Sequence, residues 1–154
     1  MKNILLIVLI MASAHSFAQR TPFKNMTEKR GYIGIGTKTP DELLTVKGKI
    51  HTQEVRVDLN GAVAPDYVFE HYFLGSSEIK PHYRLLSLSE IEAYLEKHHH
   101  LPGIPSAQEI EKEGLSLKEM NLALLEKVEE LTLYVIQQQK EIDALKEKVS
   151  KIED

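Results

Sequence analysis

The chain of 154 residues contains no cysteine, which excludes disulfides, thiolate metal sites, cysteine nucleophiles and a lipobox anchor. Its formal net charge of −4 argues against nucleic acid or an anionic membrane as a partner. The last third of the sequence has the pattern of one long helix, so the part left to form a compact core is small. A core of that size often depends on association with other chains.

The first residues predict a secretory signal peptide. Lys2 precedes an apolar run from Ile4 to Ala12, and the small residues Ser16 and Ala18 follow, which is the pattern of a leader that is cleaved after Ala18. The apolar run has about half of the ~20 residues that a membrane-spanning helix needs, and no later segment is apolar enough to span. We therefore expect residues 1–18 to be removed and the protein to be secreted, periplasmic or at the cell surface, without a membrane span.

Two segments precede the aromatic part of the chain. Residues 19–30 are polar and lack periodicity, so we expect a disordered lead-in. Residues 31–64 mix glycine with β-branched residues and predict a short β-stem segment. The alternation is clearest from Val55 to Leu59 and indicates a half-buried strand, with a turn at Asn60-Gly61.

The glycines from Gly31 to Gly36 do not form a phosphate-binding loop. Lys38 falls one place too late for the P-loop pattern, and no helix pattern opens after Pro40. We expect these glycines to be structural and to mark places where two stretches of backbone approach closely.

Residues 65–115 predict a small, aromatic-rich helical module. The stretch from Pro65 to Glu90 holds five of the ten Tyr and Phe residues of the chain, which favours a small core over a ligand cage. Three serines each stand three residues before a glutamate, the pattern of a capping box at a helix start: Ser87 and Glu90, Ser106 and Glu109, and Ser116 and Glu119. We expect the first helix to end by Leu101, because Pro102 follows, and the second to end at Gly114.

Residues 116–154 predict a coiled-coil oligomerisation helix. Two sets of positions repeat every seven residues and are apolar except at two places, with charged residues beside them. The first set is Asn121, Val128, Val135, Ile142 and Val149, and the second is Leu124, Leu131, Gln138, Leu145 and Ile152. Such a helix could instead pack on its own domain, but the compact part is too small to cover a helix about 50 Å long. We expect these ten residues to form an interface between copies of the chain.

The residues of the two sets favour two strands. β-branched residues at the first set with leucine at the second are typical of dimers, and Asn121 at a first-set position fixes the register. Gln138 lies in the leucine set, where it costs stability unless the amides meet around the axis.

The three histidines from His98 to His100 raise the question of a metal site. On a continuing helix His98 and His99 point about 100° apart, whereas two helical donors share a metal at a spacing of three or four residues. In an extended chain His98 and His100 lie on one side, but neither His82 nor Glu96 stands at a diagnostic spacing for a third ligand. We interpret the cluster as a helix end and expect no metal, no cofactor and no catalytic residue.

Three stretches together resemble a known family: GYIGIGTKTPDELLTVKGKI from Gly31, PDYVFEHY from Pro65, and HLPGIPSAQEIEKEGLSLKEMNLALLEKVEELTLYVIQQQKEI from His100. They are similar to secreted proteins of Bacteroidetes-type bacteria that are described as tail-fibre-domain proteins. The C-terminal part of those proteins is akin to the endosialidase-type intramolecular chaperone domain of phage tail spikes. The resemblance covers most of residues 31–145, and residues 100–134 are its most specific part.

The resemblance implies a homotrimer in which β segments wind about a common axis and a C-terminal helical module sets the register of three chains. It therefore favours three strands over two. In the phage domains a serine followed by an aspartate releases the chaperone by self-cleavage. Here no Ser-Asp pair precedes the module, and Glu78 stands where the aspartate is needed, so we expect the helical end to stay attached. The segment GSSEIKPH from Gly75 is extra length relative to the family pattern.

The hypothesis that follows is a non-enzymatic structural protein of mixed β and α fold, with a short β stem, a small α+β module and a long coiled-coil helix. It would act as an oligomeric fibre, stalk or cap. The alternative is a carbohydrate- or protein-binding module on an oligomeric stalk, with a cell-surface protein or glycan as partner. Exposed aromatic residues between Tyr67 and Tyr83 would favour that alternative.

Overall fold

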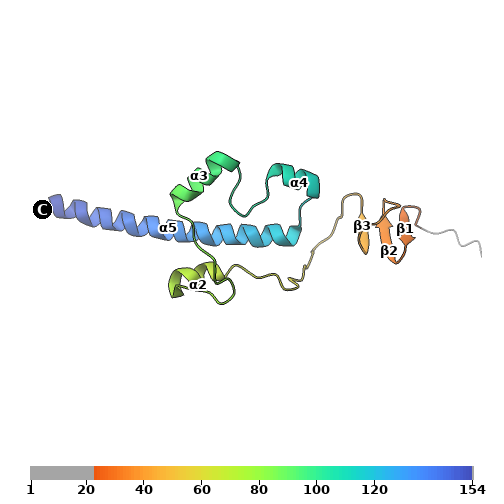
Figure 1. Cartoon of the computed structure of the whole chain (residues 1–154), viewed down its shortest axis with the longest axis horizontal. Helices are drawn as coiled ribbons and strands as arrows, with labels where there is room; N and C mark the ends of the chain where they lie inside the picture. The colour runs from red at the N-terminus through yellow and green to blue at the C-terminus, as the bar shows by residue number, and fades with distance from the viewer. Residues whose placement is uncertain (1–22, 154) are drawn as a thin grey trace, which may run out of the picture. The chain divides into compact units, whose positions relative to one another are not determined.

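The computed structural model describes residues 23–153 and has a mixed β and α fold (Figure 1). The described residues form a three-stranded sheet and four helices, of which the last is a long C-terminal helix. This confirms the mixed class, while the predicted signal peptide and its cleavage after Ala18 lie outside the described residues. The chain divides into two compact units between Val55 and Arg56. No helix within residues 23–153 is long and apolar enough to cross a membrane.

The first unit is a sheet of strands β1 (Met26–Lys29), β2 (Tyr32–Ile35) and β3 (Leu44–Val46). Strands β1 and β2 are antiparallel, with Met26 opposite Ile35, and β2 and β3 are parallel, with Ile33 opposite Leu44. The chain reverses between β1 and β2 at Arg30 and Gly31, whose φ angles are both positive, 56° and 82°. Two positive φ angles in succession are what a tight hairpin turn requires.

The prediction of a disordered lead-in over residues 19–30 is wrong for the described end of that segment, where β1 lies. Its sequence is polar, but its backbone pairs with β2, and the Gly31 N–H donates a hydrogen bond to Glu28 Oε1 at 2.8 Å. A polar edge strand needs only a partner for its backbone groups and no apolar pattern of its own, so composition did not reveal it.

Gly34 and Gly36 confirm the structural interpretation of the glycines. A Cβ atom at Gly34 would lie 2.5 Å from the Thr37 carbonyl oxygen, and one at Gly36 would lie 2.9 Å from the Lys47 carbonyl oxygen. Gly36 also has a φ of +72°, a conformation that other residues rarely adopt. Glycine therefore lets the turn after β2 lie against the backbone that leaves β3.

The sheet leaves its apolar side chains largely uncovered. Among the described residues of this unit only Gly34 and Thr45 are buried, and the Thr45 hydroxyl donates to Asp41 Oδ1 at 2.7 Å. Ile33 and Leu44, which lie opposite each other, are 39% and 58% exposed. Among its described residues, the first unit therefore has no apolar core of its own.

The strand predicted over Val55 to Leu59 is not formed, because no other strand in the described part of the chain pairs with it, and its alternating apolar side chains stay exposed. The turn predicted at Asn60-Gly61 is confirmed. Both residues have positive φ angles, 47° and 84°, and the Ala62 N–H donates to the Leu59 carbonyl oxygen at 3.0 Å.

The second unit contains helices α2 (Tyr67–Leu74), α3 (Leu88–His98), α4 (Ala107–Glu113) and α5 (Leu117–Glu153). The capping boxes at Ser87 and Ser106 are confirmed, since both partners of each box make their hydrogen bonds. At α5 only half of the box is present, with the Glu119 N–H donating to Ser116 Oγ at 3.4 Å. Helix α3 ends before Leu101 and α4 is capped by Gly114, as predicted.

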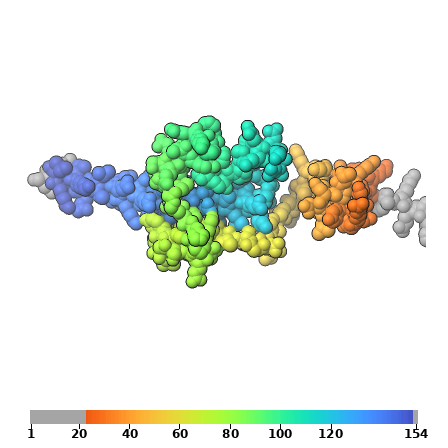
Figure 2. Space-filling view, viewed as in Figure 1, coloured from red at the N-terminus to blue at the C-terminus, as the bar shows by residue number. Residues whose placement is uncertain are grey.

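The core of this unit is small and aromatic. Tyr67 and Val68 of α2 are buried with Leu133 of α5, and the space-filling view shows the chain around α2 and α3 lying along α5, which continues beyond them (Figure 2). Four further side chains pack on these three residues: Phe69, Tyr72, Tyr83 and Leu85. Four of the five aromatic residues between Pro65 and Glu90 therefore belong to the core or contact it, as predicted.

Candidate assembly surface

Helix α5 has two faces with different surroundings. Leu133 and Tyr134 are buried, at 0% and 7% exposure, whereas Leu131 and Val135 beside them are 61% and 55% exposed. A helix turns about 100° per residue, so residues this close in sequence point in different directions. One side of α5 holds the module of residues 65–115, and the other side is open.

The predicted interface residues lie on the open side. Eight of them are apolar and between 46% and 83% exposed: Leu124, Val128, Leu131, Val135, Ile142, Leu145, Val149 and Ile152. Asn121 and Gln138 are exposed as well, and Asn121 Nδ2 donates to the Leu117 carbonyl oxygen of its own helix at 2.8 Å. We call these ten residues the heptad stripe. No described part of the chain buries it.

The module packs on heptad positions other than a and d, which form the seam of a coiled coil. With Asn121 as position a of the heptad, Glu126 and Leu133 are f residues, Glu130 is a c residue and Tyr134 is a g residue. The f position points away from the axis of a coiled coil. Packing of the module on α5 and packing of partner helices on the heptad stripe therefore do not compete for the same surface.

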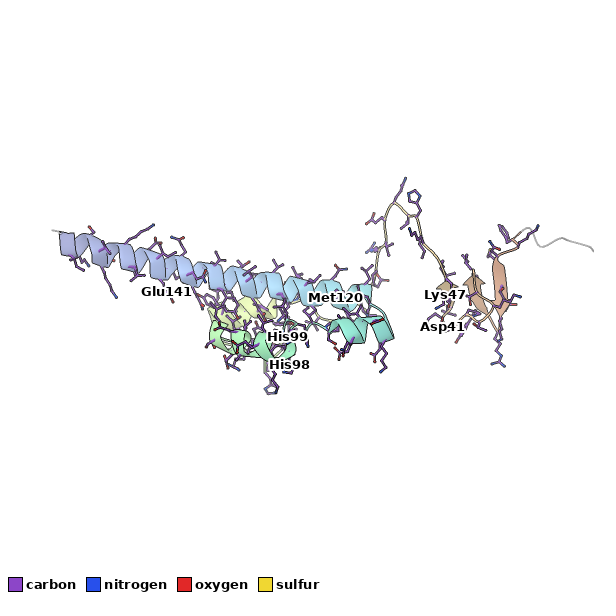
Figure 3. All side chains as sticks on the ribbon, turned by 90° about the horizontal axis from the view of Figure 1, so that it is seen from above. Asp41, Lys47, His98, His99, Met120 and Glu141 are labelled. Carbon is purple, nitrogen blue, oxygen red and sulfur yellow. The ribbon has the colours of Figure 1, made fainter. Side chains whose placement is uncertain are left out.

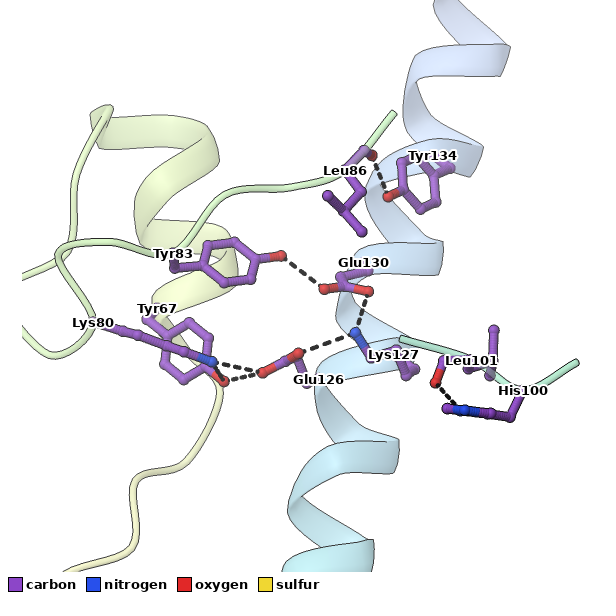
Figure 4. A network of polar contacts seen from close by, with 10 residues as sticks. All are labelled: Tyr67, Lys80, Tyr83, Leu86, His100, Leu101, Glu126, Lys127, Glu130 and Tyr134. Atoms are coloured by element: carbon purple, nitrogen blue, oxygen red, sulfur yellow. Dashed lines mark hydrogen bonds and ion pairs between the residues drawn. The ribbon is translucent and has the colours of Figure 1, made fainter. Parts of the chain in front are cut away.

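A polar network ties the module to α5 through Glu126 (Figure 4). The Tyr67 hydroxyl donates to Glu126, and Lys80 Nζ donates to the Tyr67 hydroxyl at 3.0 Å and to Glu126 Oε2 at 3.1 Å. Burial alone would raise the pKa of Glu126, but hydrogen bonds from Tyr67, Lys127 and Lys80 hold that pKa below its usual value. Glu126 is therefore charged and fully engaged in holding the module.

A second group of contacts surrounds Glu130, one turn further along α5. The Tyr83 hydroxyl donates to Glu130 Oε1 at 3.0 Å, and Lys127 Nζ donates to Glu130 Oε2 at 2.8 Å. Burial and the neighbouring Glu130 carboxylate raise the pKa of Tyr83. The Tyr134 hydroxyl donates to the Leu86 carbonyl oxygen at 2.6 Å, and burial raises the pKa of Tyr134 to about 12. Both tyrosines keep their protons and act as donors at neutral pH.

Glu129 is a buried carboxylate without a matching donor. The residue is 7% exposed, and its Oε2 atom makes no hydrogen bond to any described residue. Burial raises the pKa of Glu129, and the negative charges of Asp66 and Glu126 raise it further. A buried carboxylate that lacks a partner is destabilising when it is charged, which is why burial raises the pKa of Glu129 above its usual value.

The segment from Gly75 to His82 makes further contacts that the sequence did not predict. Ser77 is 4% exposed and its hydroxyl donates to Glu70 of α2, while Ile79 N–H donates to Ser77 Oγ at 3.2 Å. This turn places Lys80 within hydrogen-bond distance of Tyr67 and Glu126. Only the contacts between distant segments reveal that role, and no local motif carries it.

His98 and His99 lie at the end of α3 (Figure 3), and His100 follows in the loop. His99 is the C-cap residue with a φ of 59°, and the His98 ring stacks on Tyr94 with 4.3 Å between ring centroids. The His100 ring meets Tyr94 edge-on at 5.6 Å. Within residues 23–153 no group of three or more His, Asp or Glu side chains is arranged to hold a metal ion. Helix α3 ends at His98 and is capped by His99, which confirms the prediction that the cluster lies at a helix end.

Comparisons of this chain with protein-family models, with curated proteins and with solved structures find no match. The resemblance to tail-fibre-domain proteins therefore stays a prediction from the sequence motifs.

Proposed function

We propose that this protein is an exported, non-enzymatic structural protein that assembles with copies of itself through the heptad stripe, as a fibre, stalk or cap. The observation that supports the proposal most strongly is the division of α5 into two faces. The module takes the outer face through Leu133, Tyr134 and Glu126, and the heptad stripe, apolar except at Asn121 and Gln138, remains uncovered on the opposite side. A homotrimer is favoured, as the family resemblance implies, and a dimer is the alternative.

The assembly would work physically and without chemistry. The sheet of residues 26–46 exposes Ile33, Leu44 and other apolar side chains, and joining chains at a coiled coil raises the effective concentration of such sheets for one another. Because the chains are already joined, their sheets can pack on one another without a second bimolecular association step. The helix would stay attached as a permanent clamp, since no Ser-Asp pair precedes the module.

One observation bears on the alternative, a protein- or glycan-binding module on the stalk. Phe73 and Leu74 at the end of α2 are 66% and 76% exposed. Phe73 is the one aromatic residue of the Pro65 to Glu90 stretch that neither lies in the core nor packs against it. A cell-surface protein or glycan would contact the module there, but a single exposed ring is a small anchor.

The test is the mass of the chain from Gln19 to Asp154 in solution. We expect light scattering to give a multiple of the chain mass, three times for the favoured state. The double variant Leu131→Glu and Val135→Glu should give the mass of one chain, because it places charges on the heptad stripe. The matched control Gln137→Glu and Ser150→Glu adds the same charge at exposed positions outside the stripe and should stay oligomeric. A monomeric parent chain, or a stripe variant that assembles as the parent does, would contradict the proposal.

A further inference from the structure

A cleft lies beside the first turns of α5. It has a volume of about 660 Å³ and is lined by side chains from the end of α3, from the loop before α4 and from α5. Its lining includes Tyr94, Ile104, Met120 and Ala123, and Met120 lies near the start of α5 (Figure 3). Met120 lines the cleft and directly precedes Asn121, the first residue of the heptad stripe, so this edge of the cleft lies beside the start of the stripe.

The heptad positions of Met120 and Leu125 connect this cleft to a neighbouring chain. With Asn121 at position a, Met120 is a g residue and Leu125 is an e residue. Coiled coils usually place charged residues at e, yet Leu125 is apolar and 44% exposed. An apolar side chain with this much exposed surface is available for contact with a neighbouring helix.

In a parallel coiled coil the g residue of one helix lies beside the e residue of its neighbour about five residues further along. Met120 and Leu125 have this spacing. In an antiparallel pair the e residues would face each other, and Leu125 would not meet Met120.

We propose that the cleft of one chain receives Leu125 of a second copy, which locks adjacent helices side by side in a parallel and in-register arrangement. This inference rests on the proposed function, because it assumes that the heptad stripe assembles. Charge complementarity supports the same occupant: the e residue before Leu125 is Lys118, and the cleft is lined by the carboxylates of Glu113 and Glu119. The chain itself would thus determine both the direction and the register of its neighbours.

Cross-linking between chains tests the contact. The parent sequence has no cysteine, so Met120→Cys and Leu125→Cys can be prepared separately from the Gln19 to Asp154 chain, mixed by unfolding and refolding, and treated with a short bismaleimide. We expect covalent pairs in the mixture and not in either variant alone. A control mixture of Met120→Cys with Gln137→Cys, on the outer side of the helix, should give no pairs.

A second variant keeps the inference testable if a cysteine variant fails to fold. Leu125→Glu should weaken assembly about tenfold or more, because it places a charge where the proposed contact would bury a leucine, whereas Leu125→Met should assemble as the parent does. Pairs formed by either cysteine variant alone, or an oligomer without pairs and without an effect of Leu125→Glu, would overturn the inference and leave the proposed function intact. A monomeric parent chain would instead overturn the proposed function.

Discussion

Replacement of Leu133 by alanine should loosen the module from α5 and leave the number of chains unchanged. Leu133 has no exposed surface and packs with Tyr67 and Val68. Such a replacement costs about 2–5 kcal/mol in a buried site. Because the core has few residues that could refill the cavity, we expect about 3 kcal/mol. That value corresponds to about a hundredfold change in the population of the open state.

Amide hydrogen exchange of α2 measures this change, since its amides exchange when α2 detaches from α5. Leu131→Ala is the matched control, because it removes the same atoms from a side chain that is 61% exposed on the other face. Leu131→Ala should change the amide exchange rates of α2 by about threefold or less, and it should lower the oligomer mass at low protein concentration. If Leu133→Ala leaves α2 exchange within threefold of the parent, or if both variants accelerate it equally, the assignment of two faces to α5 is wrong.

Three further predictions follow from the local structure. Glu129→Gln should stabilise the protein at pH 7 and have little effect near pH 4. The folded-state pKa of Glu129 is raised above its unfolded value of about 4.3. The parent protein is therefore not destabilised by Glu129 below that pH, and it loses stability as the pH rises through the folded-state pKa. The neutral Gln side chain removes this loss. Urea midpoints of variant and parent at the two pH values measure this, and a pH-independent difference would contradict it. Gly36→Ala should disrupt the sheet, because its φ is +72° and the new Cβ would meet a backbone oxygen, whereas Gly48→Ala meets nothing within 4 Å and should be neutral by circular dichroism. Ser106→Ala should lower the free energy of unfolding by about 1 kcal/mol. Ser116→Ala should lower it less, because the capping box at Ser116 is only half formed. Equal losses of stability in urea unfolding would argue against this.

The features that sequence predicted well are those in which cause and effect lie within a few residues of each other. A capping box joins residues three apart, and both Ser87 and Ser106 form it. The turn at Asn60-Gly61 depends on the tolerance of those two residues for positive φ. The glycines from Gly31 to Gly36 were predicted to be structural as a group, but neither Gly36 nor the Lys47 oxygen that requires it could be named from sequence.

The features that sequence missed depend on partners far along the chain. Strand β1 forms because β2 pairs with it, while the alternation from Val55 to Leu59 finds no strand to pair with among residues 23–153. The ion pair of Lys80 with Glu126 joins residues that are 46 positions apart. Leu133 resembles any other leucine of the long helix in sequence, and only the packing of Tyr67 and Val68 distinguishes it.

The end of α5 gives an independent physical reason for assembly. All side chains of residues 141–152 are exposed, so this end of α5 lacks the tertiary packing that supplies most of the stability of helices in proteins. The ion pairs of Lys146 with Asp143 at 3.9 Å and of Lys151 with Glu147 at 2.7 Å are exposed, and such pairs contribute little. The remaining contribution to the stability of this helix end is burial of its apolar stripe residues: Ile142, Leu145, Val149 and Ile152. If only partner helices can bury them, the helicity of this end and the association of chains are one equilibrium, whereas the first half of α5 is also held by its own module.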